Sequence, residues 1–419
     1  MKILAKLLFV SFLAVNLLFV TSCKKDSSDT QENPAPLGLG DDPLPYQNTS
    51  WMARIPDTKY LCEFTIPGTH DAAADLHTSQ QGTMKNFVIC QDYYISNQML
   101  LGIRWFDIRL HYSNGVLTAH HAQYYLHKNF NDLLTAGLDF LAQYPTETII
   151  YMIKQEDSNA SQDDFTQAVY NYLVGRSSDL SLFYLGHDMP ALGQVRGKLV
   201  VMTREGCTSA YENKRGMYLT WDDNTKGENV DNCDYPLWVQ DHYSCVTVPY
   251  SEKISEIEQG IIYANTANNN RLYINFASCE KDLDHYLTTI AENINPPIED
   301  YLNAHPEWNT CGVIMLNFAG GADDSKKSTT RSIVPELVQV IIDHNNFFKE
   351  VTIGTQTWMQ NNLDVTMFRN GEPISNLTYD RIITTRLTLF RTTYIPADSR
   401  IWQMASEPAS SLPLYHQTD

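Results

Sequence analysis

The chain has 419 residues and a formal net charge of −19 at pH 7. This acidic balance argues against nucleic-acid binding, which requires a basic surface. It also argues against docking to anionic lipid by charge alone, although a covalently attached lipid would bring the protein to a membrane without it.

The N-terminus has the pattern of an export signal. Lys2 and Lys6 precede an apolar run over residues 7–20, which is shorter than a typical membrane-spanning helix. The run ends at Val20-Thr21-Ser22-Cys23, which resembles a bacterial lipobox whose cysteine carries the lipid. An ordinary signal peptide with a chance cysteine is the alternative. We expect a signal peptide over residues 1–22.

The next residues predict a tether and a targeting signal. Lys24-Lys25-Asp26 resembles the surface-export tag of Bacteroidetes lipoproteins, and residues 23–50 are rich in Ser, Asp, Asn, Pro and Gly. Such a composition favours a flexible linker. We therefore expect an exported protein anchored through Cys23 at the outer membrane or cell surface.

The chain contains eight cysteines, including Cys23, and no CxxC pair, so no zinc site is indicated. In an exported protein some thiols can oxidise, and Cys233 with Cys245 is the candidate disulfide. We expect most of the other cysteines to be buried free thiols.

Between residues 59 and 346, short apolar runs alternate with amphipathic segments. The expected strands cover residues 60–66, 104–110, 116–120, 148–153, 198–203, 237–240, 272–276 and 312–318. The expected helices cover residues 129–143, 162–174, 251–265, 282–294 and 332–346. This alternation predicts an α/β fold, an irregular (β/α)8 TIM-like barrel over residues 51–346. A doubly wound open sheet is the alternative.

The first of these strands precedes a titratable pair. The apolar run from Leu61 to Ile66 ends at Pro67-Gly68, which predicts a strand stopped by a turn, and His70 and Asp71 follow directly. A histidine in this place can exchange a proton near neutral pH.

Further polar side chains gather where the later apolar runs stop. They are Asp107 and Arg109, His120 and His121, Lys154 and Glu156, Arg204, and Asp241 and Tyr243. A salt bridge or a helix cap would explain any one of them, but in a barrel these strand ends meet at one face, where active sites lie.

Two histidines and an arginine suit the cleavage of a phosphodiester. One imidazole takes the proton of the attacking hydroxyl, the other protonates the leaving oxygen, and the guanidinium stabilises charge on the phosphate. Lys154, Glu156, Arg204 and Asp241 can hydrogen-bond a polyhydroxylated ring, and Tyr243 can stack on its apolar face. No acidic cluster calls for a metal ion.

These motifs together resemble the bacterial phosphatidylinositol-specific phospholipases C over about residues 55–346. The family's opening motif is matched by Ile66-Pro67-Gly68-Thr69-His70-Asp71. The following segments continue in family order and spacing: Phe106-Asp107-Ile108-Arg109, His120-His121, Glu147-Thr148-Ile149-Ile150 through Lys154 and Glu156, and Arg196-Gly197-Lys198-Leu199-Val200.

The resemblance implies an irregular barrel and a reaction without metal or cofactor. Phosphatidylinositol, or a glycosyl-phosphatidylinositol (GPI) anchor, would give diacylglycerol and inositol 1,2-cyclic phosphate, whose hydrolysis is a slower second step. We expect a monomer that acts at a membrane surface. The alternatives are an inositol-lipid binding protein with weak turnover and a phosphodiesterase for another headgroup.

The resemblance also implies residue roles. His70 would be the general base, His121 the general acid, with Asp107 assisting the acid. Arg109 would hold the phosphate, beside Asp71, in place of the Ca²⁺ of metal-dependent relatives. The inositol pocket would be lined by Lys154, Glu156, Arg204, Asp241 and Tyr243.

Two positions depart from the family pattern. Where the family has an aspartate that orients the base, this chain has Asn317, so we expect a weaker base, or Asp323 or Asp324 in that role. Asn114-Gly115 favours a two-residue hairpin turn, which pairs Arg109 with His120. His121 as the acid therefore needs a bulge or a longer turn, and His120 is the alternative.

Two further segments stand apart from these motifs. Trp221, in the segment 218–228, either inserts into lipid or packs within the protein. The tail over residues 347–419 begins like a small repeated module of secreted Fibrobacter and Bacteroidetes proteins, and its composition changes from Arg381. It predicts an incomplete module without a catalytic role, or else an unfamiliar terminal domain.

Overall fold

A computed structural model describes residues 44, 46–75, 85–266, 271–281, 285–321, 336–345, 350–353 and 356–359. The expected signal peptide, the lipobox and most of the tether lie outside these residues, as do Asp323, Asp324 and the tail beyond residue 359. Within the described part of the chain, every helix is too short or too polar to cross a membrane.

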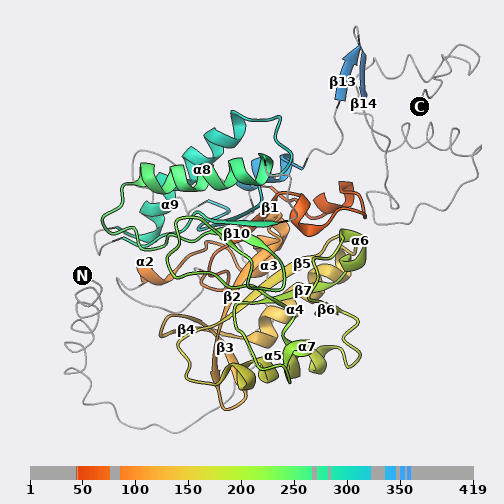
Figure 1. The fold of residues 1–419 in the computed structure, drawn as a ribbon, viewed down its shortest axis with the longest axis vertical. Helices are drawn as coiled ribbons and strands as arrows, with labels where there is room; N and C mark the ends of the chain where they lie inside the picture. Colours follow the sequence, from red (N-terminus) through yellow and green to blue (C-terminus); the bar gives the residue numbers. More distant parts are fainter. Residues whose placement is uncertain are drawn as a thin grey trace, which may run out of the picture. The chain divides into compact units, whose positions relative to one another are not determined.

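Parallel strands form the centre of the fold (Figure 1). Their order is β6-β7-β5-β2-β1-β12-β11-β10, and β9 adds an antiparallel strand beside β10. The bounds are β1 Ile66–Thr69, β2 Trp105–Ser113, β3 Val116–His121, β4 Tyr124–Asn129, β5 Ile149–Gln155, β6 Phe183–Tyr184, β7 Leu199–Thr203, β8 Met217–Tyr218, β9 Glu228–Val230, β10 Leu237–Gln240, β11 Leu272–Phe276 and β12 Val313–Leu316.

The strand order is that of a barrel. β1 pairs with β2 on one side and with the last parallel strand, β12, on the other. Among the described strands, no pairing joins β9 to β6 or β8, so the sheet is curled and open along that line. All residues of β7 and β12 are buried, as expected for parallel strands covered on both faces. The predicted irregular barrel is therefore confirmed in preference to the doubly wound sheet.

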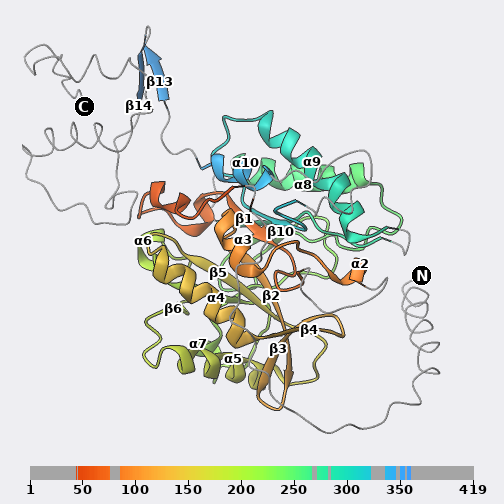
Figure 2. The same ribbon diagram turned by 180° about the vertical axis from the view of Figure 1, so that it is seen from behind.

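Helices cover the outside of the sheet, and Figures 1 and 2 show α8 and α9 side by side. The longer helices are α4 Phe130–Gln143, α5 Gln162–Arg176, α8 Tyr250–Thr266 and α9 Leu287–Asn303. The shorter ones are α2 Lys85–Val88, α3 Ile95–Leu101, α6 Leu192–Val195, α7 Glu212–Arg215 and α10 Leu337–Asp343, with 3-10 turns η1 Trp51–Arg54 and η2 Leu61–Glu63.

Helix α4 shows how the sequence specifies these elements. The side chain of Asn129 accepts a hydrogen bond from the backbone N–H of Asp132 (3.1 Å), and the Asp132 carboxylate accepts from the N–H of Asn129 (2.8 Å). This capping box fixes the start of the helix. Leu133, Leu134 and Leu141 then lie buried on its inner face, as their spacing predicts.

The expected first strand is wrong in its bounds. Residues 61–63 form η2, and β1 begins at Ile66 and includes Pro67 and Gly68. Pairing with β2 starts only at Gly68, so the missing N–H of Pro67 leaves no ladder bond unmade. A Cβ on Gly68 would lie 2.4 Å from Met315 Sδ, so glycine permits the close approach of β12.

Other differences are smaller. Strand β4 and helix α3 were not expected, and α9 continues through Pro296 and Pro297 instead of ending at residue 294. Backbone carbonyls of Asn48 and Thr49, placed in the expected tether, accept hydrogen bonds from Arg104 NH2 at 3.1 Å each, so the domain begins before residue 51.

The predicted Cys233–Cys245 disulfide is wrong in this structure, where both thiols are free. Cys233 donates to the carbonyl of Tyr235 (3.0 Å) and Cys245 to that of His242 (3.4 Å). The buried free thiols include Cys90, Cys245, Cys279 and Cys311, as expected.

A separate two-stranded antiparallel sheet follows the barrel domain. It pairs β13 Glu350–Ile353 with β14 Gln356–Met359. These strands fall on the segment that resembles the start of a secreted repeat module.

Candidate active site

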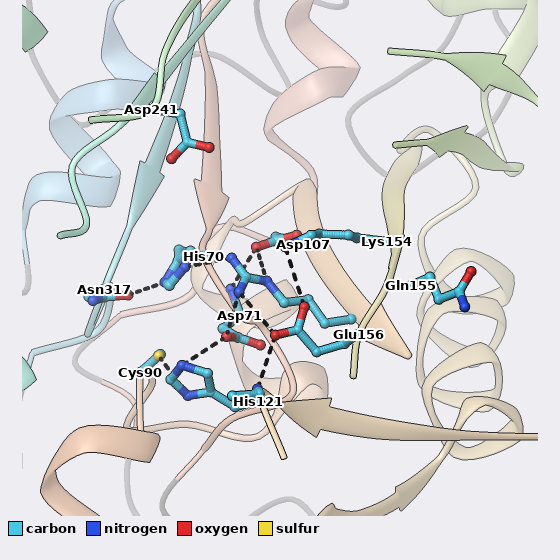
Figure 3. Close-up of polar contacts among 12 residues, drawn as sticks. His70, Asp71, Cys90, Asp107, His121, Lys154, Gln155, Glu156, Asp241 and Asn317 are labelled. Atoms are coloured by element: carbon cyan, nitrogen blue, oxygen red, sulfur yellow. Dashed lines mark hydrogen bonds and ion pairs between the residues drawn. The ribbon is translucent and has the colours of Figure 1, made fainter. Parts of the chain in front are cut away.

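The structure brings eight of the predicted site residues into one connected group at and beyond the carboxyl ends of β1, β2, β3, β5 and β12 (Figure 3). They are His70, Asp71, Asp107, Arg109, His121, Lys154, Glu156 and Asn317.

Both ring nitrogens of His70 have a partner. Nδ1 lies 2.9 Å from Asn317 Oδ1, and Nε2 lies 2.9 Å from a guanidinium nitrogen of Arg109. A guanidinium only donates, so Nε2 is the accepting nitrogen and Nδ1 carries the proton that the amide oxygen accepts. His70 is thus held as a neutral imidazole whose lone pair faces Arg109.

The surroundings of His70 favour this neutral form. Burial and the charge of Arg109 lower the pKa of His70 to about 3, despite an opposing effect of Asp107. The backbone of the residue is also fixed, because the side-chain amide of Gln91 donates to the carbonyls of His70 (2.8 Å) and Leu316 (2.9 Å).

Arg109 is the centre of the group. Its Nε donates to Asp107 Oδ2 at 3.1 Å, and its NH1 lies 3.4 Å from Asp71 and 3.8 Å from Glu156. Burial alone would lower the pKa of Arg109, but these three carboxylates raise it well above its usual value. The guanidinium is therefore a permanent positive charge, and its NH1 makes only long contacts.

Asp71 joins Arg109 to His121. Its Oδ2 lies 3.4 Å from Arg109 NH1 and 3.5 Å from His121 Nε2. Burial raises the pKa of Asp71 against the opposing charges of Arg109 and His121. Its backbone has a positive φ of 47°, a conformation that few residues other than glycine adopt.

His121 is held from the other side by backbone. Its Nδ1 donates to the carbonyl of Val88 at 2.7 Å, because a carbonyl can only accept. The remaining nitrogen, Nε2, lies 3.5 Å from the Asp71 carboxylate, and only the imidazolium form of the ring has a proton to donate there.

The expected role of Asp107 is corrected by these contacts. Asp107 Oδ2 accepts from Arg109 Nε and from the backbone N–H of Asp71 (3.2 Å), whereas the carboxylate beside His121 is that of Asp71. Burial would raise the pKa of Asp107, but Arg109, His70 and the Asp71 N–H together hold it below its usual value. Asp107 therefore orients the arginine.

The structure places His121, and not His120, at this group. The hairpin turn is the predicted two-residue Asn114-Gly115, and β2 pairs with β3 in regular register up to Leu110 and Ala119. The expected bulge or longer turn is thus absent from this strand pair, and the register shifts between β3 and β4 instead. His120 stacks on His111, with ring centroids 4.6 Å apart.

Lys154 and Glu156 share one face, as their spacing predicts, and lie 3.3 Å apart. Glu156 also accepts a hydrogen bond from the backbone N–H of Ala122 at 3.0 Å. Ala122 follows His121 and has a positive φ of 49°. Burial would raise the pKa of Glu156, but Arg109 and Lys154 hold it below its usual value.

The remaining predicted residues, Arg204, Asp241 and Tyr243, form a second group. Figure 3 shows Asp241 apart from the two histidines. Trp221 connects Asp241 and Arg204, because its Nε1 donates to Asp241 Oδ2 (3.0 Å) and its ring lies under the Arg204 guanidinium (3.3 Å). Burial lowers the pKa of Arg204. Tyr243 donates its hydroxyl to Asp223 at 2.8 Å.

Trp221 is therefore packed within the protein, and its insertion into lipid is ruled out in this conformation. The sequence offered no sign of its bond to Asp241. Nor did it point to Cys90, whose thiol lies 3.9 Å from His121 Nδ1, or to Gln91, because both follow β1 in a segment without periodicity.

One set of side chains could bind a metal ion by proximity. Ligand atoms of His70, Asp71 and Cys90 lie within 4.8 Å of one another in the described part of the chain. However, Arg109 already contacts both His70 and Asp71, and burial raises the pKa of the Cys90 thiol well above its usual value. A cation there would have to displace the guanidinium.

Comparisons with known proteins point to one family. Residues 64–205 match the family described as phosphatidylinositol-specific phospholipase C, X domain. A 1-phosphatidylinositol phosphodiesterase of Staphylococcus aureus is 30% identical over 298 residues, covering 68% of this chain and 93% of that protein. One of Listeria monocytogenes is 26% identical over 287 residues, covering 68% of this chain and 83% of the relative.

Solved structures give the same result for the fold. A structure of the phosphatidylinositol-specific phospholipase C of S. aureus superimposes with a TM-score of 0.61 at 27% identity, covering 71% of this chain and 98% of that one.

Proposed function

This chain belongs to the family of phosphatidylinositol-specific phospholipases C, and we propose that it cleaves phosphatidylinositol to diacylglycerol and inositol 1,2-cyclic phosphate. The observation that carries the proposal is the continuous path from His70 Nε2 through Arg109 and Asp71 to His121 Nε2, with no step longer than 3.5 Å.

His70 acts as the general base. Its Nε2 is the unprotonated nitrogen, and in the substrate-free site it accepts a hydrogen bond from Arg109. A bound phosphate draws the guanidinium toward its oxygens, which exposes Nε2 to the inositol 2-hydroxyl. The hydroxyl oxygen then attacks phosphorus as its proton moves to Nε2.

His121 acts as the general acid. For this step the ring carries a proton on each nitrogen; the proton on Nε2, beside Asp71, passes to the diacylglycerol oxygen as the phosphorus–oxygen bond breaks, and Nδ1–H stays bonded to Val88. Arg109 remains charged throughout and stabilises the negative charge that develops on the phosphate oxygens. The cyclic phosphate can then be hydrolysed slowly by the same two groups with their proton roles reversed.

The second group of residues, together with Lys154 of the first, would bind the inositol ring. Lys154 and Arg204 would supply donors, Asp241 would accept, and Tyr243 would offer a ring face. Lys154, Arg204 and Asp241 lie close enough to Asp107 or Arg109 for their charges to interact. A GPI anchor carries the same phosphoinositol unit, so we include it among the substrates. The chain is proposed to act as a monomer, tethered at the outer membrane or cell surface through a lipid on Cys23, on the basis of its lipobox-like segment.

Phosphorus NMR of the products from phosphatidylinositol, with a chelator present, tests the reaction. We expect the signal of a five-membered cyclic phosphate to appear first and to decay slowly. Tight inositol binding without release would support a binding protein instead. Cleavage that requires added metal would support a phosphodiesterase of another kind.

Two variants separate the acid from the base. We expect His70→Ala and His121→Ala each to lower cleavage of phosphatidylinositol by about 10³- to 10⁴-fold. With a nitrophenyl inositol phosphate, whose leaving group needs no proton, His121→Ala should recover most of its rate and His70→Ala should not. Equal recovery of both variants would contradict the assignment.

A further inference from the structure

The loop between β10 and α8, residues 241–249, carries Asp241 and Tyr243 and runs beside the segment that follows β11. Ser244 and Glu280 form an isolated parallel bridge. The N–H of Glu280 donates to the carbonyl of Tyr243 (2.7 Å), and the N–H of Cys245 donates to the carbonyl of Glu280 (2.9 Å).

Two cysteines flank this bridge on one face. Cys245 follows Ser244 and Cys279 precedes Glu280, so both side chains lie on the same side of the paired segments. Both are buried, with exposed fractions of 1% and 4%. The two thiols interact with each other, which lowers the pKa of Cys245 and raises that of Cys279.

Two ammonium groups border the thiol pair. Lys253, fully buried on α8, donates to the carbonyl of His242 (2.9 Å), and Lys281 donates to the carbonyls of Cys245 (2.9 Å) and Val248 (2.7 Å). The interaction with Cys279, with the charges of Lys253 and Lys281, lowers the pKa of Cys245 although burial opposes it. Cys245 therefore loses its proton more readily than an ordinary thiol, as in reactive dithiols.

We propose that Cys245 and Cys279 form a disulfide that joins the loop bearing Asp241 and Tyr243 to the end of β11. The oxidant is an organic disulfide such as oxidised glutathione. The Cys245 thiolate attacks one of its sulfurs and expels a thiolate, and Cys279, losing its proton, attacks the mixed disulfide and expels the second. Two protein thiols and one disulfide thus become one protein disulfide and two small thiols.

The crosslink acts on ring binding. In the reduced protein, the bridge at Ser244 and Glu280 holds the loop by backbone hydrogen bonds. The covalent bond keeps Asp241 and Tyr243 in place without substrate. Because His70, Arg109 and His121 lie on other segments, the oxidised enzyme has a lower KM for phosphatidylinositol and the same kcat. This part rests on the proposed function, whereas the disulfide itself does not.

Peptide mapping tests the disulfide without any assay of activity. The full chain is incubated with oxidised or reduced glutathione, alkylated and digested. We expect a crosslinked peptide containing Cys245 and Cys279 after oxidation, lighter by two hydrogen atoms than the sum of its parts. The peptide should also appear with Cys207→Ser and be absent with Cys279→Ser. The crosslink should raise the melting temperature of the oxidised protein by about 5 °C. Both cysteines alkylated after oxidation would overturn the proposal.

A second probe needs no oxidant. A trivalent arsenical, which bridges two neighbouring thiols, should bind one equivalent that wild type and Cys207→Ser retain and Cys245→Ser loses. Equal binding by all three proteins would overturn the pairing. If the mapped disulfide forms and KM does not change, the link to ring binding is wrong. Loss of all cleavage in the reduced and oxidised protein would contradict the proposed function and leave the disulfide result intact.

Discussion

Two arginines of the β2 segment, Arg104 just before the strand and Arg109 in its middle, do different work. Arg104, just before the strand, has every guanidinium nitrogen in a hydrogen bond: Nε to Glu147, NH1 to the carbonyls of Met99 and Ile103, and NH2 to those of Asn48 and Thr49. Its side chain and that of Glu147 are wholly inaccessible to solvent.

Arg109, within the same strand, is bound differently. Its Nε and NH2 contact Asp107 and His70, but NH1 reaches Asp71 and Glu156 only at 3.4 and 3.8 Å. A guanidinium whose N–H groups are all bonded within the protein supports the fold. A guanidinium such as that of Arg109, whose NH1 makes only long contacts, can still bind an anion. The comparison matches the division in barrels between an amino end that provides stability and a carboxyl end that provides chemistry.

The largest effect is expected from Arg109→Lys. A single ammonium cannot bridge Asp107 and a phosphate, so we expect kcat/KM for phosphatidylinositol to fall about 10³-fold, as when a preorganised donor is lost. The melting temperature should change little, because lysine keeps a positive charge among the three carboxylates. A clear fall in the melting temperature of this variant would show that Arg109 also stabilises the fold.

Arg104→Ala should show the opposite pattern. Breaking the buried pair leaves Glu147 without its partner, so we expect the free energy of unfolding to fall by about 3–5 kcal/mol in urea titrations. Activity per folded molecule should be unchanged. Burial raises the pKa of Glu147 even beside Arg104, so the double variant Arg104→Met/Glu147→Leu should recover most of the stability.

Failure of that recovery would show that the hydrogen bonds of Arg104 to the backbone of Asn48 and Thr49 matter more than its charge pair. A loss of kcat in the stable double variant would contradict the division between a structural Arg104 and a functional Arg109.

The sequence predicted the bounds of the plainly apolar strands better than those of β1. The expected strands over residues 237–240 and 272–276 match β10 and β11, because short apolar runs bounded by polar residues suit strands buried on both faces. The bounds of β1 were missed because Pro67-Gly68 usually marks a turn, and only the pairing partners decide otherwise.

The site was predictable where it depends on alternation. Asp107 and Arg109 are two residues apart on one strand, and they do contact each other. The role of Asp71 was not predictable, because its side chain is aimed by a positive φ that no pattern encodes. Arg104 was not singled out at all, since nothing in its neighbours reveals that it is fully buried.

Asn317→Asp extends the comparison to the base. A carboxylate in this position would stabilise the imidazolium that forms as His70 takes its proton, so we expect the rate at pH 7 to rise about tenfold. It would also raise the pKa of His70 from about 3, so the acidic limb of the pH–rate profile should move to higher pH. The variant should therefore lose more activity than wild type near pH 4.

The pH profile of kcat/KM from pH 3 to 8 measures both effects. Unchanged or lower activity at pH 7, with an unmoved acidic limb, would show that a carboxylate outside the described residues already orients the base.

Glu156→Gln is expected to give the smallest effect and to decide between two roles for one residue. If Glu156 binds the inositol ring, KM should rise and kcat should stay constant. Its contacts favour positioning instead, because Oε1 accepts from Ala122 beside His121 and faces Arg109. The amide keeps the bond to Ala122 and loses the charge, so we expect kcat to fall about threefold with KM unchanged.

Glu156→Ala removes both contacts and provides the matched comparison. If the glutamate supports the turn after His121, this variant should lose more kcat than Glu156→Gln on phosphatidylinositol, and less on a nitrophenyl substrate that needs no acid. An equal loss on both substrates would mean that Glu156 acts through Arg109 alone. The carboxyl end of the sheet would then depend on one guanidinium, whose freedom to bind phosphate is set by the carboxylates that surround it without saturating it.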